Sequence, residues 1–92
     1  MVVYAEVEYM IYDVQSLKEK RSIVKRITKR VQNEFNFSIA EIEFEDLWQR
    51  TKLGIATVSN EYVHAEKVIQ QVIRFIDQNP EVERTITNIY PL

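Results

Sequence analysis

The sequence contains no cysteine, and it has only one histidine, one glycine and two prolines in 92 residues. Without cysteine the chain can form no disulfide, no thiolate nucleophile and no thiolate metal cage. A single histidine cannot supply the two or three imidazoles of common zinc sites. These absences exclude most zinc and redox chemistry, and we expect no metal site and no cofactor.

Long apolar runs are also absent, and the N-terminus lacks the basic start and apolar stretch of a signal peptide. We therefore expect a cytoplasmic protein with no membrane partner. Hydrophobic residues make up 46% and charged residues 28% of the chain, which is typical of globular proteins. This length and composition predict one domain over residues 1–92.

The formal net charge of −2 conceals a segregation of charge along the chain. Residues 16–35 hold seven basic and two acidic side chains, a local charge of +5, which leaves −7 for the rest. A local field of this sign can attract anions within about 8 Å at physiological salt, whatever the net charge. The alternative interpretation is an ordinary solvated helix face.

Alternation of apolar and polar residues predicts four strands, at Val2–Tyr12, Phe37–Glu45, Lys52–Ser59 and Val82–Tyr90. Both parities of residues 53–58 are apolar or small, so the pattern does not decide which of them faces the core.

Helical periodicity predicts two helices, each with a capping residue at its start. Ser16 and Glu19 form a capping box for the first, which runs to Phe35. Asn60 is the predicted cap of the second, which Asn79-Pro80 ends. In the first helix, one arc is apolar and the opposite side is basic. The apolar arc consists of Leu17, Val24, Ile27, Val31 and Phe35.

Two strand-helix-strand halves joined by a hairpin predict an α+β, ferredoxin-like βαββαβ fold. Right-handed crossovers then give an antiparallel sheet of order 4-1-3-2, with both helices on one face. In this topology the start of the first helix and the loop 46–50 share one end of the molecule.

Basic residues at a helix N-terminus are unfavourable for the helix dipole, so their presence at residues 18–21 indicates that an anion binds there. Lys20 falls within the apolar arc, from which its side chain could extend towards the loop. Trp48 beside Arg50 is a pairing that stacks a base and holds a phosphate. The predicted RNA-binding residues are Lys18, Lys20, Arg21, Lys25, Lys29, Trp48 and Arg50.

The alternative for this end of the molecule is purely structural. Glu19, Glu45 and Asp46 would neutralise the basic residues, and Trp48 would fold back on the core.

The outer parity of the first two strands carries both charged and apolar side chains. Its carboxylates, predicted as Glu6, Glu8, Glu41 and Glu43, would repel RNA from the open sheet face that many proteins of this fold use. Its apolar members, predicted as Tyr4, Met10, Tyr12 and Ile39, would instead serve a homodimer or a protein partner.

An enzymatic function is disfavoured. His64 lies at the border of the second helix's apolar stripe, where a single histidine is usually a packing residue. The loop Asp13–Leu17 contains no glycine, whereas acylphosphatase, which shares this fold, needs a glycine-rich phosphate loop there. Glu41, Glu43 and Glu45 diverge along a strand by about 7 Å per step, so they predict no metal site. We expect no catalytic residue.

Three segments resemble the YlxP-like family of small bacterial proteins, a domain family without settled function. They are Ser16-Leu17-Lys18-Glu19-Lys20-Arg21, Ser38-Ile39-Ala40-Glu41, and Asp46-Leu47-Trp48-Gln49-Arg50 with Leu53 to Asn60. The resemblance runs from Tyr4 to about Pro80 and is poor in the last strand. It implies a ferredoxin-like fold and a gene neighbourhood shared with translation initiation and ribosome-maturation factors, and it supplies no catalytic residue. The resemblance thus favours ribosomal RNA or a ribosomal subunit as the partner.

Overall fold

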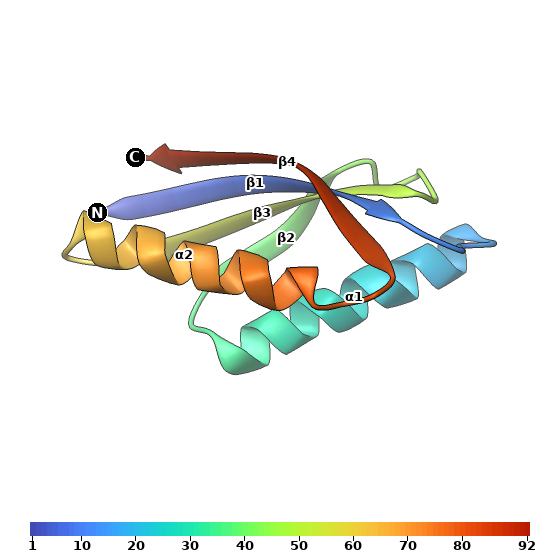
Figure 1. Ribbon diagram of the computed structural model, residues 1–92, viewed down its shortest axis with the longest axis horizontal. Helices are drawn as coiled ribbons and strands as arrows, with labels where there is room; N and C mark the ends of the chain where they lie inside the picture. Colours follow the sequence, from blue (N-terminus) through green and yellow to red (C-terminus); the bar gives the residue numbers. More distant parts are fainter.

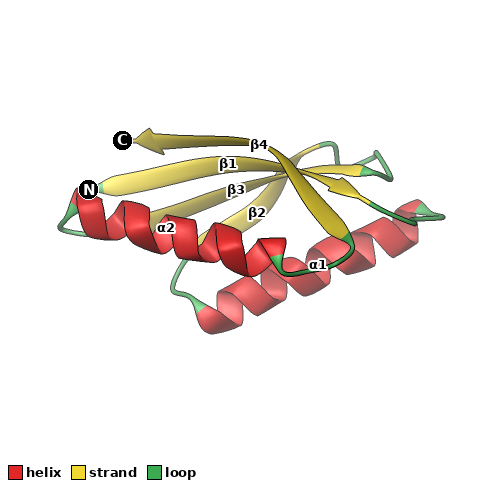
Figure 2. Ribbon diagram, in the orientation of Figure 1, coloured by secondary structure: helices red, strands yellow, loops and turns green.

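The computed structural model describes all 92 residues and shows one antiparallel sheet with both helices on the same side (Figures 1 and 2). The strands lie in the order β2-β3-β1-β4, which is the predicted ferredoxin-like order read from the opposite edge. The elements are β1 (Val2–Ile11), α1 (Leu17–Glu34), β2 (Ser38–Glu43), β3 (Arg50–Val58), α2 (Tyr62–Asp77) and β4 (Val82–Pro91).

The central strands β1 and β3 supply the sheet's contribution to the core. In β1 the odd-numbered residues from Val3 to Ile11 are buried, as their alternation predicts. The register places Ala5 opposite Ile55 and Val7 opposite Leu53. Because directly opposite residues share a face of the sheet, Leu53 and Ile55 face the helices. The parity that the sequence leaves open is therefore decided by strand pairing.

The edge strand β2 differs from the prediction. Ile39 is buried in the core, and Glu41 lies opposite Leu53 on the helix side, so neither faces outward as the alternation predicts. The register shifts between Glu41 and Glu43, and this bulge returns Glu43 to the outer face opposite Lys52. A one-residue shift exchanges the two faces of a strand, and the sequence contains no glycine or proline there to indicate it.

Helix α1 begins as predicted, with the Ser16 hydroxyl accepting a hydrogen bond from the Glu19 backbone N–H at 3.1 Å. The Glu19 carboxylate accepts from the backbone N–H of Gln15, one residue before the expected donor. The buried stripe contains Val24, Ile27 and Val31 from the predicted arc, together with Lys20.

Helix α2 begins one residue later than predicted. Its N-cap is Glu61, which makes no side-chain capping bond, so the prediction that Asn60 caps this helix is wrong. The Ser59 hydroxyl instead accepts from the Glu61 backbone N–H. The buried stripe of α2 consists of Ala65, Ile69, Val72, Ile73 and Ile76.

Candidate nucleic-acid interface

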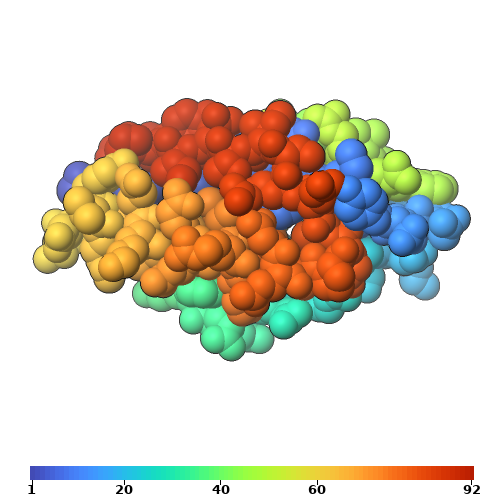
Figure 3. All heavy atoms as spheres, viewed as in Figure 1, coloured from blue at the N-terminus to red at the C-terminus, as the bar shows by residue number.

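The start of α1 and the β2–β3 loop, residues 44–49, meet at one end of the molecule, as the topology predicts. The Lys20 ammonium lies 2.9 Å from the carbonyl oxygen of Phe44 and 3.3 Å from that of Glu45. Arg21 reaches Asp46 at 3.5 Å in an exposed and therefore weak ion pair. In Figure 3 the yellow-green atoms of this loop protrude at the upper right.

Lys20 is fully buried and forms part of the internal structure. Its ammonium lies 2.5 Å from the carboxylate of Glu41, which also accepts a hydrogen bond from the Thr51 hydroxyl at 2.6 Å. Together with the two loop carbonyls, Glu41 engages all three donors that a lysine ammonium has. No part of the side chain is exposed, so Lys20 cannot contact an RNA phosphate and is removed from the predicted RNA-binding set.

Trp48 and Arg50 lie on the other side of the sheet from the basic face of α1. Trp48 is 49% exposed and lines a shallow hollow of about 480 Å³ with Met10, Leu47, Gln49 and Arg50. Arg50 pairs with Glu8 at 2.8 Å, and its guanidinium lies 3.9 Å from the centre of the Phe44 ring. These contacts hold Arg50 on the outer sheet face, so the predicted single site of basic helix and Trp48 loop is divided in two.

The remaining predicted residues form a row on the exposed face of α1. Lys18, Lys25 and Lys29 are exposed and take part in no ion pair, and Arg21 flanks them. Intervals of seven and four residues bring the three lysines to one side of the helix, over about 16 Å at 1.5 Å per residue. We call Lys18, Arg21, Lys25 and Lys29 the lysine row.

The other two arginines of α1 are held on the side that faces β4 and α2. Arg26 pairs with Glu81 at 2.5 Å, and this hydrogen bond holds the pKa of the Glu81 carboxyl below its ordinary value. Arg30 donates to the Asn79 side chain at 3.3 Å and lies over the Phe75 ring. Arg26 and Arg30 are therefore engaged with other parts of the fold, whereas the lysine row faces solvent.

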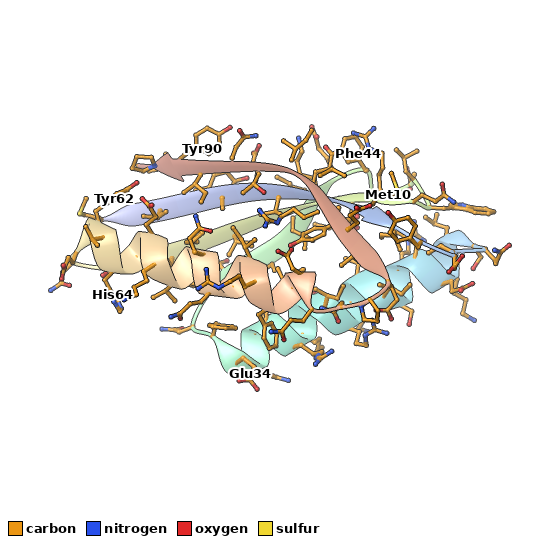
Figure 4. The ribbon with its side chains drawn as sticks, viewed as in Figure 1. Met10, Glu34, Phe44, Tyr62, His64 and Tyr90 are labelled. Atoms are coloured by element: carbon orange, nitrogen blue, oxygen red, sulfur yellow. The ribbon has the colours of Figure 1, made fainter.

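The remaining chemistry-bearing residues are dispersed. His64 is exposed on α2 and does not pack in the core as we expected (Figure 4). Glu41 faces the helices, whereas Glu43 faces outward. No group of three or more His, Asp or Glu side chains converges in a way that would hold a metal ion. Neither helix has both the length and the apolar character needed to cross a membrane.

Residues 2–89 match the model of a family described as a protein of unknown function, DUF503. The chain belongs to this family. It is 59% identical over 87 residues to the "Uncharacterized protein YlxP" of Bacillus subtilis (strain 168), with 95% of each chain covered. The family match includes most of β4, beyond the limit at about Pro80 that the sequence motifs indicate.

A structural relative outside the family has the same fold. The chain superimposes on a de novo designed protein with a ferredoxin fold, LFR1 1, solved by solution NMR. The TM-score is 0.57 at 17% identity, covering 100% of this chain and 87% of the designed protein. At this identity the likeness shows the ferredoxin fold alone, which agrees with the observed strand order.

Proposed function

We propose that this protein is a non-enzymatic, cytoplasmic accessory protein that docks on RNA, with ribosomal RNA as the partner, through the lysine row. The observation that carries the proposal is the solvent-facing arrangement of Lys18, Lys25 and Lys29, which have no acidic partner in a chain whose formal net charge is −2. Acidic residues outnumber basic ones in the chain, 14 against 12, so unpaired bases in one row are unexpected by composition.

The shape of the lysine row favours an extended polyanion over a small anion. The row follows a convex helix for about 16 Å, and no concave pocket is built around it. A single phosphate group would be held by converging donors, whereas a nucleic-acid backbone presents phosphates along a line. Contacts of this kind position a nucleic acid without reading its sequence.

RNA of the translation apparatus is the partner that agrees with the gene neighbourhood implied by the family resemblance. The corrected contact set is Lys18, Arg21, Lys25 and Lys29. Trp48 and Arg50 are excluded from it because they face the outer side of the sheet, where Arg50 is paired with Glu8.

The test is the salt dependence of binding to purified ribosomal subunits, measured by cosedimentation. Binding of the native chain should weaken steeply between about 50 and 200 mM salt. Each phosphate contact contributes about 0.7–0.9 to the slope of log K against log salt. The double variant Lys25→Gln/Lys29→Gln should therefore bind more weakly and reduce the slope by about 1.5.

The matched control is the double variant Lys67→Gln/Arg74→Gln, which removes the same charge from the exposed side of α2. It should bind with nearly the native slope. A salt-independent native interaction, or an equal loss in the control, would show that the lysine row is not the docking surface.

A further inference from the structure

The solvent side of α1 carries only side chains that can donate hydrogen bonds. At about 100° per residue, seven exposed side chains lie within about 60° of the centre of the lysine row, and none is acidic or apolar. We call these seven residues the donor surface. They are Lys18, Arg21, Ser22, Lys25, Lys29, Gln32 and Asn33. A partner of this surface must therefore present hydrogen-bond acceptors.

The two acids of α1 lie away from the donor surface. Glu19 is about 100° and Glu34 about 160° from the centre of the lysine row around the helix axis. The Glu19 carboxylate is also engaged before the helix, where it accepts from the Gln15 backbone N–H at 3.4 Å. From Lys18 to Asn33, about 22 Å along the axis, the donor surface thus contains no carboxylate that would repel an anion.

The aromatic rings next to α1 are engaged with one another. Phe35 stacks on Phe37 with 6.0 Å between ring centres, and it meets Phe75 edge-on at 5.3 Å. All three rings are partly buried against the core. The half-exposed Trp48 lies on the other side of the sheet. Proteins that bind single-stranded RNA stack its bases on exposed aromatic side chains, so the donor surface does not suit a single strand.

The lysines of the donor surface form a narrow line. Lys18, Lys25 and Lys29 lie within about 40° of one another around the helix. A line this narrow can neutralise phosphates of two strands only where the two backbones approach each other closely. The narrow major groove of A-form RNA brings its backbones together, whereas the major groove of B-form DNA is about 12 Å wide. The geometry therefore favours an RNA double helix over a DNA duplex.

From these features we propose that α1 docks across the narrow major groove of double-helical RNA, with the lysine row on phosphates of both strands. Ser22, Gln32 and Asn33 flank the lysines and donate to neighbouring phosphate or 2′-hydroxyl oxygens. In this arrangement the protein recognises the shape of an A-form helix and not its base sequence. The inference rests on the proposed function, because it specifies the form of RNA that the lysine row binds.

The first test compares three nucleic acids by fluorescence anisotropy at about 50 mM salt. They are an RNA duplex of about 20 base pairs, a DNA duplex of the same sequence, and polyuridine with the same number of phosphates. The RNA duplex should bind at least about tenfold more tightly than the other two, and a second RNA duplex of unrelated sequence should bind equally. Polyuridine or DNA that binds as tightly as the RNA duplex overturns the proposal.

Trp48 provides an independent readout, because it is the only tryptophan of the chain and lies across the sheet from α1. Docking of an RNA duplex on α1 should leave its fluorescence unchanged, whereas a base stacked on the indole would quench it. Quenching of Trp48 by the RNA duplex overturns the proposed location.

A variant in the donor surface supplies the second test. Ser22→Glu places a carboxylate one turn from both Lys18 and Lys25, so it should weaken binding of the RNA duplex by at least about tenfold. The matched control Gln71→Glu makes the same charge change on the exposed side of α2, and it should keep the affinity within about threefold. A Ser22→Glu variant with native affinity overturns the proposal.

Circular dichroism establishes that both variants are folded. If Ser22→Glu is unfolded, Lys25→Gln/Lys29→Gln replaces it in the same comparison.

The outcomes separate this inference from the proposed function. If ribosomal subunits bind with a salt slope that depends on the lysine row, but RNA duplexes are not preferred, the duplex inference fails and the proposed function stands. If no form of RNA binds through the lysine row, both fail.

Discussion

At the scale of single residues, the most consequential side chain is Lys20. It is among the largest fully buried side chains of the chain, and its ammonium is the only one in the core. Glu41 and two loop carbonyls satisfy it, so it connects α1 with both β2 and the β2–β3 loop. Lys20 therefore anchors the first residues of this loop, Phe44 and Glu45, to the start of α1.

Removal of Lys20 should therefore destabilise the fold. Lys20→Met leaves the carboxylate of Glu41 without its counter-ion and two loop carbonyls without their donor, so the free energy of unfolding should fall by about 3–5 kcal/mol. Urea denaturation followed by circular dichroism measures it. The control Lys18→Met, at an exposed and unpaired position, should change stability by no more than about 0.5 kcal/mol.

A compensating variant separates the ion pair from the volume of the lysine stem. Lys20→Met/Glu41→Gln removes both charges, and it should recover more than half of the loss because no unpaired charge stays in the core. A Lys20→Met variant as stable as the native chain would show that the pair contributes little.

Of the ion pair between Lys20 and Glu41, only the lysine could be predicted from the sequence. The helical periodicity of α1 placed Lys20 in the apolar arc and directed it towards the β2–β3 loop, and both features are confirmed. Its partner could not be identified, because the alternation of β2 placed Glu41 on the outer face. Only the register with β3 shows that Glu41 faces inward.

At the scale of elements, the two helices differ in how their first turns are satisfied. The Ser16 side chain caps α1, whereas the N-cap of α2, Glu61, makes no capping bond. The capping box was visible in the sequence because it depends on residues only three positions apart. The observed start of α2 lies one residue after the predicted one. Asn60 and Glu61 are adjacent, and the spacing of apolar residues in the sequence does not decide which of them is the last residue before the helix.

This difference predicts unequal effects of the same substitution. Ser16→Ala should lower the free energy of unfolding by about 1 kcal/mol, since an α1 backbone N–H loses its acceptor. Glu61→Ala should change it by only a few tenths of a kcal/mol, since no capping bond is lost. Thermal unfolding of the two variants in parallel measures the difference, and equal effects would contradict a capping role for Ser16.

At the scale of the whole molecule, charge is sorted by layer. The helical layer presents the lysine row, and the outer sheet face presents apolar side chains together with two ion pairs, Arg50–Glu8 and Lys52–Glu43. Composition indicated the basic segment correctly, but it could not distinguish Lys18, Lys25 and Lys29 from Lys20, Arg26 and Arg30. The distinction depends on acids and acceptors that are distant in sequence, such as Glu41, Glu81 and Asn79.

Stability against alkali is a second property of the whole molecule. Four tyrosines, Tyr4, Tyr9, Tyr12 and Tyr62, have a raised pKa. For Tyr9 the main cause of the raised pKa is burial. The second cause is the nearby Asp77 carboxylate, which accepts a hydrogen bond from the Tyr9 hydroxyl at 2.9 Å. The native chain therefore retains phenol protons at pH values where the unfolded chain releases them.

The contribution of these tyrosines to the free energy of unfolding should consequently be fully present below about pH 10. Above that pH the free energy of unfolding should fall, by up to about 1.4 kcal/mol per pH unit for Tyr9. Urea midpoints between about pH 9 and pH 11.5 measure this slope. Tyr9→Phe should make it shallower, although the variant also loses the bond to Asp77. A slope that Tyr9→Phe leaves unchanged would exclude Tyr9 as its source.

The position of β1 in the centre of the sheet has a consequence for biosynthesis. Val3 pairs with Pro91 and Ile11 with Val82, so the first strand to be made has the last one as a neighbour. At about 5–20 residues per second, a nascent β1 waits roughly 4 to 18 seconds for that neighbour. One edge of its backbone is left unpaired during this interval, and the native sheet is completed only when translation has passed β4.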